Sequence, residues 1–323
     1  MHSPPRRIAL GLRILLAVAA ALLATTCGPT LSLEHPLAVR VLVPPELDTL
    51  PLRLGVERGY FSAEGLTVTV LQEPDQCAGL HTLASGGAEI AFGASTVVVE
   101  AVYSGLRVTI LAEAAWLAGR TAAIVVRDDG SVPDLAALTR RPVGAPHAGT
   151  QDRLLAQASL DNTSGAAPSN QVEWATMDMS EHIVTHLADH DIDAAVIREP
   201  WLTDAIHTHG FTTLTYLAAT NLLYPLSTYV ATTTWADRHP DTVAAFQRAL
   251  HQAARDSTRP AIDNLAVRQL PINPDTAARM DIPLFPPRGP SVSQLQRVSN
   301  LLQHYGIIAG PYRIAPLVAP AGE

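Results

Sequence analysis

Three histidines, His182, His186 and His190, recur at every fourth position, a spacing that places side chains on one face of a helix. Two histidines spaced in this way can bind Zn²⁺. The same spacing also fits a solvated polar face, and the apolar Ile183 and Leu187 between them favour that second interpretation. No HExxH, CxxC or EF-hand motif occurs, so we predict no metal site.

Nucleophilic and cofactor chemistry also lacks its usual residues. The segment 93–97, GASTV, contains a serine but not the second glycine of a nucleophile elbow. All 22 basic residues are arginine, which excludes a lysine Schiff base with pyridoxal phosphate and the lysine of a phosphate-binding P-loop. We therefore predict a protein that is not an enzyme and uses no cofactor.

Binding chemistry is better represented, because polar and aromatic residues gather where predicted strands end and helices begin. Ligands of open α/β folds bind outside the carboxyl ends of strands, where unpaired N–H groups at helix starts attract oxygens. Ser95 and Thr96 could instead cap a helix, and the tryptophans could pack in the core or between lobes. We predict ligand contacts from Asp48, Thr49, Ser95, Thr96, Trp116, Gly149, Thr150, Glu199, Trp201 and Tyr224.

The elements that position these residues alternate between strands and helices with short connections. This rhythm predicts an α/β fold in which mostly parallel sheets are covered by helices. Alternating or β-branched segments predict strands over residues 38–43, 67–70, 90–92, 121–127, 172–175, 193–197 and 227–233. Apolar periodicity and caps predict helices ending at Gly59, over 77–84, from Thr96, and over 135–138, 152–158, 179–188, 241–255 and 291–305.

Length and charge restrict the class of protein further. A chain of 323 residues with 47% hydrophobic residues can form two α/β lobes with real cores. Its net charge of −8 gives no general attraction to nucleic acid, so we predict no nucleic-acid partner. We expect a monomer.

The N-terminus has the pattern of an export signal. Arg6 and Arg7 precede the short apolar run 14–24, which leads directly to Cys27. LLATTC resembles a lipobox, in which the cysteine becomes the lipidated first residue, although Thr26 replaces the usual small residue. We predict a signal peptide over 1–27, lipidation of Cys27 and an extracytoplasmic location; the alternative is a secreted or periplasmic protein without the lipid. The arginine pair also leaves Sec and twin-arginine export open.

The chain contains two cysteines, Cys27 and Cys77. If Cys27 carries the lipid, Cys77 remains single, and we expect it to be buried and inert. A Cys27–Cys77 disulfide is the alternative, which an exported location would permit.

Four segments, in this order, resemble one known family. They read GYFSAEGL, LASGGAEIAFG, IDAAVIREPW and STYVATTTWADRHPDTVAAFQRAL. They are similar to the SsuA/THI5-like substrate-binding proteins of bacterial ABC importers, which bind sulfonates, nitrate or thiamine precursors. The resemblance covers roughly residues 38–310.

The resemblance implies a type II periplasmic-binding-protein fold: two lobes, each a mixed, mostly parallel sheet flanked by helices, with a ligand cleft between them. It implies a tether over 28–37, a first lobe over 38–123 and 225–314, and a second lobe over 124–224. We expect a disordered tail over 315–323. The implied partners are a small-molecule ligand, an ABC permease and, through the lipid anchor, the membrane.

The ligand implied by the resemblance is a heterocycle, such as a thiamine-type pyrimidine precursor, or an aliphatic sulfonate. A sulfonate would need helix N-termini and an arginine such as Arg120 or Arg153. A ring would stack on Trp116, Trp201 or a tyrosine, with Asp48 or Glu199 accepting hydrogen bonds from ring amines. A sensory or adhesive module on the same fold is one alternative. A pyrimidine-synthase-like enzyme is another, but the chain lacks the lysine and the cysteine cluster of that branch.

Overall fold

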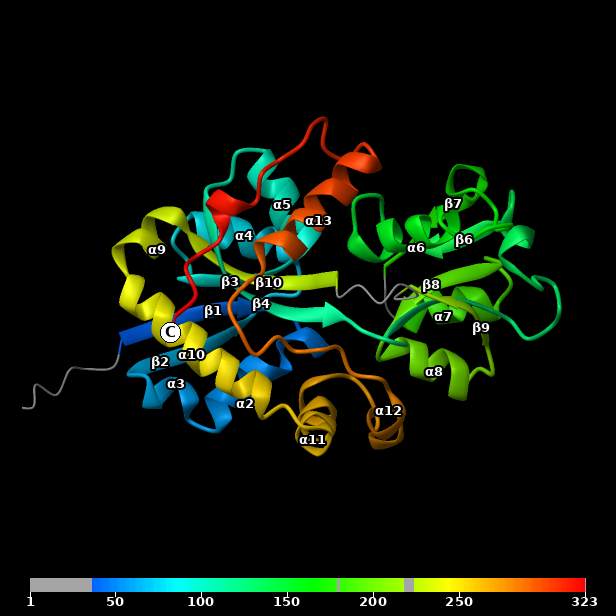
Figure 1. Cartoon of the computed structure of the whole chain (residues 1–323). Coiled ribbons are helices and arrows are strands. Elements are labelled where there is room, and N and C mark those ends of the chain that lie inside the picture. The colour runs from blue at the N-terminus through cyan, green and yellow to red at the C-terminus, as the bar shows by residue number, and fades with distance from the viewer. Residues whose placement is uncertain (1–36, 179–180, 218–223, 323) are drawn as a thin grey trace, which may run out of the picture. The chain divides into compact units, whose positions relative to one another are not determined.

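The computed structural model describes residues 37–322 except 179–180 and 218–223. Two separate five-stranded sheets, each flanked by helices, form the two lobes (Figure 1). The expected signal peptide, Cys27 and most of the expected tether lie outside the described residues. Leu37, which we assigned to the tether, is the first residue of a strand. The predicted two-lobed α/β fold is confirmed.

The first sheet has the strand order β2-β1-β3-β10-β4. β1 pairs in parallel with β2 and β3, whereas β10 runs antiparallel to both β3 and β4. Its strands are β1 (Leu37–Val43), β2 (Leu66–Gln72), β3 (Ile90–Ala94), β4 (Val108–Leu117) and β10 (Tyr224–Thr232).

Both faces of the first sheet are covered. Phe246 of α10 packs with Phe61 and Tyr229 on one face, and Leu295 of α13 packs with Val98 on the other. The apolar residues of α10 recur every three or four positions, which is the spacing of a helix that buries one side. The helices are α2 (Leu50–Glu57), α3 (Tyr60–Ala63) and α10 (Pro240–Arg255) on one face, and α4 (Gln76–Ala84), α5 (Ser95–Tyr103) and α13 (Val292–His304) on the other.

The second sheet repeats this plan with the order β7-β6-β8-β5-β9. Alternate residues of β5 face opposite sides: Ile124 packs toward α6, and Val125 packs toward α7 and α8. The strands and helices of this lobe are β5 (Ala122–Val126), β6 (Pro142–Ala145), α6 (Gln151–Asp161), β7 (Glu173–Thr176), α7 (Glu181–Ala188), β8 (Ala194–Arg198), α8 (Trp201–His207) and β9 (Thr212–Tyr216).

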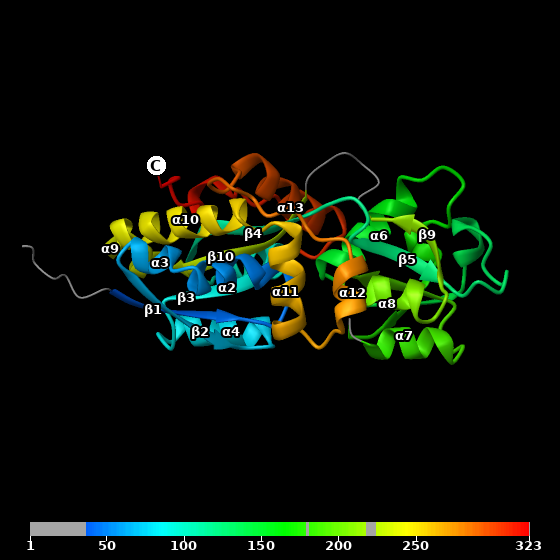
Figure 2. The ribbon, with the colours of Figure 1, turned by 90° about the horizontal axis from the view of Figure 1, so that it is seen from below.

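The segment after α10 runs along the first lobe and reaches the second. Leu284 exchanges two backbone hydrogen bonds with Trp116 of β4, at 2.8 and 3.1 Å. The N–H of Asp281 donates to the carboxylate of Glu199 at 3.1 Å, and Figure 2 shows α12 beside α8. The remaining helices are α9 (Thr233–Arg238), α11 (Arg259–Gln269) and α12 (Pro274–Arg279), and the 3₁₀ helices are Leu47–Thr49, Leu135–Leu138, Ser169–Gln171 and Ala315–Leu317.

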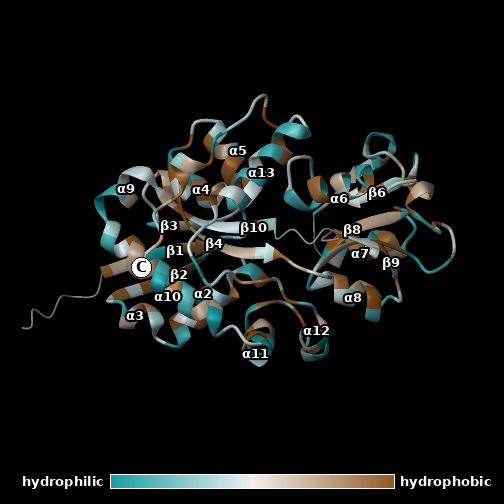
Figure 3. Ribbon diagram, viewed as in Figure 1, coloured by the Kyte–Doolittle hydropathy of each residue, from teal (hydrophilic) through white to brown (hydrophobic). Residues whose placement is uncertain are grey.

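Hydropathy follows this architecture, with brown segments in strands of both sheets and teal segments on the outer side of α10 (Figure 3). No helix within the described residues has both the length and the apolar character needed to cross a bilayer.

The C-terminal segment differs from the disordered tail that we expected. Val318 forms a bridge with Ile110 of β4, and the N–H of Ala319 donates to the Ile110 carbonyl at 2.9 Å. The buried Gln247 of α10 donates to the Pro320 carbonyl at 3.0 Å. Backbone pairing and a buried amide hold this proline-rich segment, although its own sequence has little propensity for regular structure.

Candidate ligand-binding site

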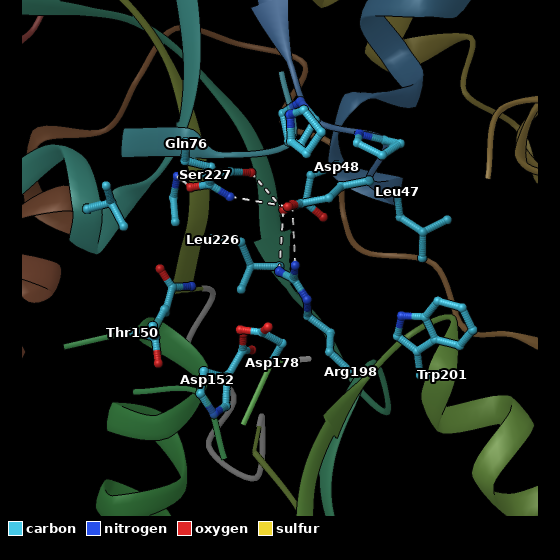
Figure 4. Close-up of a pocket in the computed structure, with 18 of the residues that line it drawn as sticks. Leu47, Asp48, Gln76, Thr150, Asp152, Asp178, Arg198, Trp201, Leu226 and Ser227 are labelled. Atoms are coloured by element: carbon cyan, nitrogen blue, oxygen red, sulfur yellow. Dashed lines mark hydrogen bonds and ion pairs between the residues drawn. The ribbon is translucent and has the colours of Figure 1, made fainter. Parts of the chain in front are cut away.

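A cavity of about 690 Å³ lies where the carboxyl ends of strands from the two sheets face each other (Figure 4). Loops after β1, β2 and β3 line it from the first lobe, and loops after β6, β7 and β8 line it from the second. Side chains at the start of β10 complete the wall. The residues that carry polar or aromatic groups there include Glu46, Asp48, Asp75, Gln76, Cys77, Thr96, His147, Thr150, Gln151, Asp152, Asp178, Arg198, Glu199, Trp201 and Ser227.

Arg198, the last residue of β8, extends across this cavity toward the first lobe. Its Nη2 atom lies 3.4 Å from Glu46 Oε2, and its Nη1 atom lies 3.6 Å from Asp48 Oδ2. The Arg198 side chain is 21% exposed and that of Asp48 only 4%. Two ion pairs between the lobes thus lie largely shielded from water, where charge interactions are stronger than at the surface.

Asp152, in the first turn of α6, belongs to the same electrostatic group. Burial raises the pKa of Asp152 and of Glu46, because it disfavours a charged carboxylate, and Arg198 only partly offsets this. Burial lowers the pKa of Arg198, but the carboxylates of Asp152, Asp48 and Glu46 outweigh it and raise that pKa overall. We call Glu46, Asp48, Asp152 and Arg198 the charge cluster.

Several buried polar groups on the cavity wall have no hydrogen-bond partner in the described structure. They are the Thr96 hydroxyl, both amide atoms of Gln151 and the Oδ1 atom of Asp152. These residues are between 0% and 8% exposed. Because an unsatisfied buried polar group costs free energy, these groups are candidates for hydrogen bonds to a bound molecule.

Other polar groups of the wall are already engaged. Gln76 donates to Glu46 Oε1 at 3.2 Å and accepts from the Ala94 N–H at 2.7 Å. The Ser227 hydroxyl donates to Asp48 Oδ2 at 2.8 Å. These bonds orient Glu46 and Asp48 toward Arg198.

Cys77 is exposed and lines the cavity, so our expectation of a buried cysteine is wrong. It occupies the second position of α4, where the solvent-facing side of the helix meets the cavity. Partial burial, with smaller contributions from Asp75 and Glu100, raises the pKa of its thiol. Cys77 is therefore protonated at neutral pH, the form that is the poorer nucleophile.

Five of the ten residues predicted to contact a ligand line the cavity: Asp48, Thr96, Thr150, Glu199 and Trp201. Glu199 also connects the lobes, since it accepts from the Thr203 N–H, the Thr203 hydroxyl and the Asp281 N–H. Burial raises its pKa to about 7. It does not pair with Arg198, which uses Glu46 and Asp48 instead.

The other five lie beside the cavity wall or behind it. Thr49 is buried and donates to the carbonyls of Pro44 and Glu46, so it stabilises the loop after β1. Ser95 is buried at the start of α5. Trp116 belongs to the bridge with Leu284. Gly149 has a left-handed backbone conformation with a φ of 90°. Tyr224 packs against apolar residues of both lobes.

The arginines proposed for a sulfonate are not among the cavity-lining residues. Arg120 is 68% exposed and pairs with Asp281 at 3.6 Å. Arg153 lies over the Trp174 ring, 5.1 Å from its centroid.

The histidines do not share one helix, because α7 ends at Ala188 and His190 has a positive φ of 66°. His186 instead pairs with Asp191 at 2.8 Å. In the described part of the chain, no three His, Cys, Asp or Glu side chains are grouped closely enough to hold a metal ion.

Sequence reasoning indicated Glu46, in the loop after the first strand, as a candidate, but it missed Gln151, Asp152 and Arg198 as site residues. Arg198 had a recognisable signal, since it is a charged residue at the end of the apolar strand 194–197. Its partners could not be identified in the same way, because Glu46 lies 152 positions away.

Comparison with known proteins supports the resemblance seen in the sequence. The sequence model of the family described as NMT1/THI5 like matches residues 47–260. No curated protein sequence matches the chain.

Several solved structures share the fold. The alkanesulfonate-binding protein SsuA from Xanthomonas axonopodis pv. citri, bound to MOPS, is 14% identical, with a TM-score of 0.71 over 88% of this chain and 98% of that one. The nitrate-binding protein NrtA from Synechocystis PCC 6803 is 14% identical, with a TM-score of 0.69 over 85% and 83%. The desulfurization enzyme DSZB is 17% identical, with a TM-score of 0.67 over 88% and 96%. Because the family match spans most of both lobes, from the loop after β1 to the start of α11, the chain belongs to the NMT1/THI5-like family.

Proposed function

We propose that this protein is the solute-binding component of an ABC importer. In this proposal it captures a small organic molecule between its lobes, closes around it by a hinge motion and delivers it to a permease. It acts outside the cytoplasm as a monomer, anchored through lipidated Cys27, and it does not transform its ligand.

The cavity between the sheets is the observation that carries this proposal. Its volume of about 690 Å³ falls within the range of small-molecule sites. It lies where two separate sheets meet, so closure of the lobes can enclose a ligand and bring the unpartnered Thr96 and Gln151 against it. Solute-binding proteins such as SsuA and NrtA have the same fold, which supports the role.

Among the two ligand classes suggested by the family, the cavity favours a ring over an aliphatic sulfonate. Trp201 lines the cavity and offers an aromatic face, whereas Arg120 and Arg153 are engaged elsewhere. Asp48 and Glu199 line the cavity too, but their oxygens already accept hydrogen bonds within the protein.

A thermal-shift screen of metabolites, followed by calorimetry, tests the proposal. We expect a compound that raises the melting temperature, binds with one-to-one stoichiometry and reduces the radius of gyration in X-ray scattering. Mass spectrometry of the compound after long incubation should recover it unchanged. Conversion to a product, or binding without compaction, would contradict the proposal.

A second candidate, an enzyme acting on a sulfur compound, deserves a test because DSZB has this fold and a thiol lines the cavity. The raised pKa of Cys77 disfavours a nucleophilic role. Cys77→Ser should therefore bind the screened compound as tightly as the parent protein. Turnover that is present in the parent and lost in Cys77→Ser would favour the enzyme.

A further inference from the structure

Building on the proposed function, we propose that the ligand is an organic cation, with a positively charged nitrogen held beside Asp152 in the field of Glu46 and Asp48. The family resemblance suggests rings and anions as ligands, whereas the carboxyl groups of this cavity favour a cation.

The charged groups of the cavity wall are predominantly acidic. Six carboxyl groups line it, on Glu46, Asp48, Asp75, Asp152, Asp178 and Glu199, against one guanidinium on Arg198 and the imidazole of His147. Figure 4 shows Asp152 and Asp178 on the opposite side of the cavity from Asp48. A ligand in the middle is therefore approached by carboxylates from both lobes.

Two of these carboxyl groups already accept two or more hydrogen bonds from N–H and hydroxyl groups outside the charge cluster. Asp75 caps α4 by accepting from the N–H groups of Cys77 and Ala78, at 2.8 and 3.1 Å. Glu199 accepts three hydrogen bonds from Thr203 and Asp281. Neither group requires a ligand, so neither is part of the argument.

The charge cluster, in contrast, contains three carboxyl groups and only one cationic side chain. Arg198 supplies one positive charge, and Glu46, Asp48 and Asp152 together supply up to three negative ones. Burial raises the pKa of Glu46 and Asp152, which is the expected effect when buried carboxylates lack sufficient counter-charge. A cationic ligand would supply that charge.

Asp152 identifies where the cation binds. It is 8% exposed, and its Oδ1 atom has no hydrogen-bond partner in the described structure. An acid in the first turn of a helix is favoured by the helix dipole, which accounts for an aspartate here. The dipole does not account for a buried oxygen without a partner, next to a Gln151 amide that also has none.

The same features disfavour an anion. Helix N-termini bind anions through free N–H groups, but Asp75 occupies those of α4, and Asp152 places a carboxylate in the first turn of α6. The walls also contain Phe92, Trp201 and Leu226, which suit a ligand with an apolar body better than a bare metal ion.

Two charge-matched series test the proposal by thermal shift and calorimetry. The ring series is benzamidine, benzamide and benzenesulfonate; the aliphatic series is butylamine, butanol and butanesulfonate. Each compound is added in millimolar excess at constant ionic strength, with calcium chloride as a bare cation. We expect the cation to stabilise most in at least one series, and the sulfonate in neither.

Variants that each remove one negative charge test which carboxylate binds the cation. Asp152→Asn should weaken binding of the stabilising cation about ten- to a hundredfold, the loss of one charge-assisted hydrogen bond. Glu46→Gln removes the negative charge but keeps one amide oxygen that can accept from Gln76 or Arg198, and it provides a second variant if Asp152→Asn does not fold. The control is Asp237→Asn, an exposed carboxylate on α9, which should leave binding unchanged.

Each outcome decides the question. The cation proposal would be overturned by a larger thermal shift with a sulfonate or with calcium, or by no shift with either organic cation. It would also be overturned if Asp152→Asn and Glu46→Gln both bound the cation as tightly as the parent protein. If metabolites from the general screen still bind, the solute-binding role stands and only the ligand class is wrong. If no metabolite binds, the proposed function itself is wrong.

Discussion

The Nη2 atom of Arg198 lies 3.4 Å from the Oε2 atom of Glu46, which joins the end of β8 in one lobe to the loop after β1 in the other. The same guanidinium contacts Asp48 at 3.6 Å. One side chain therefore both neutralises part of an acidic cavity and connects the two lobes across it.

Replacing this arginine should destabilise the protein. Arg198→Gln leaves Glu46, Asp48 and Asp152 close together without a counter-charge, and breaking a buried ion pair costs roughly 3–5 kcal/mol. Because the Arg198 side chain is 21% exposed, solvent screening reduces the expected loss to about 2 kcal/mol. Urea unfolding at neutral pH measures it. Arg120→Gln, at a residue that is 68% exposed, is the matched control and should change stability by less than about 0.5 kcal/mol.

Glu113 should make the protein less stable as the pH rises toward neutrality. It is 2% exposed in β4, where burial raises its pKa from 4.5 to about 7. Between these values the folded protein retains a proton that the unfolded chain has lost, so the free energy of unfolding falls as pH increases through this window.

The variant Glu113→Gln tests this linkage. The amide oxygen can still accept from the Ser291 N–H, and the group no longer ionises. We expect the variant to be more stable above pH 7 by on the order of 2 kcal/mol, and to match the parent near pH 4. Glu173→Gln, at an exposed position of β7, is the control. A variant that is less stable than the parent above pH 7 would contradict the prediction.

Two glycines in helices should respond to alanine with opposite signs. A Cβ atom on Gly55 of α2 would lie 2.8 Å from Phe61 Cε2 and 3.0 Å from Ala253 Cβ, so Gly55→Ala should cost about 1–3 kcal/mol through overpacking. A Cβ atom on Gly79 of α4 would meet Glu73 Cγ at an ordinary 3.5 Å. Gly79→Ala should therefore stabilise by roughly 0.5–1 kcal/mol, because alanine restricts the unfolded chain. Equal urea midpoints for the two variants would refute the close helix packing at Gly55.

Replacing the two candidate tryptophans should have different effects on ligand affinity. Trp201 lines the cavity, whereas Trp116 is held in the bridge with Leu284. Trp201→Ala should lower the affinity for the compound found in the screen by about tenfold, which is the contribution of one aromatic contact. Trp116→Ala should leave its affinity unchanged. Calorimetry measures both, with circular dichroism to verify folding, and the reverse order would place the ligand elsewhere.

Local sequence signals were sufficient for the family and for most of the fold. The apolar alternation of residues 38–43 and 193–197, and the helical periodicity of 241–255, appear as β1, β8 and α10 with shifts of one residue or so. These patterns depend on neighbours within a few positions, so the sequence alone reveals them. The short elements β9, α8, α11 and α12 were not predicted, because their patterns are weak and packing against neighbouring elements stabilises them.

The cavity was decided by tertiary structure. The rule that ligands bind at strand ends selected Asp48, Thr96 and Trp201, which line the cavity, because the rule depends only on where strands stop. The charge cluster could not be predicted by this rule, because Glu46 and Arg198 are 152 positions apart and meet only when the two lobes are assembled. Whether a strand-end side chain faces a ligand, a neighbouring lobe or the core is set by contacts between distant segments. Those contacts place Trp201 in the cavity wall, Trp116 in the bridge with Leu284, and Cys77 at an exposed position.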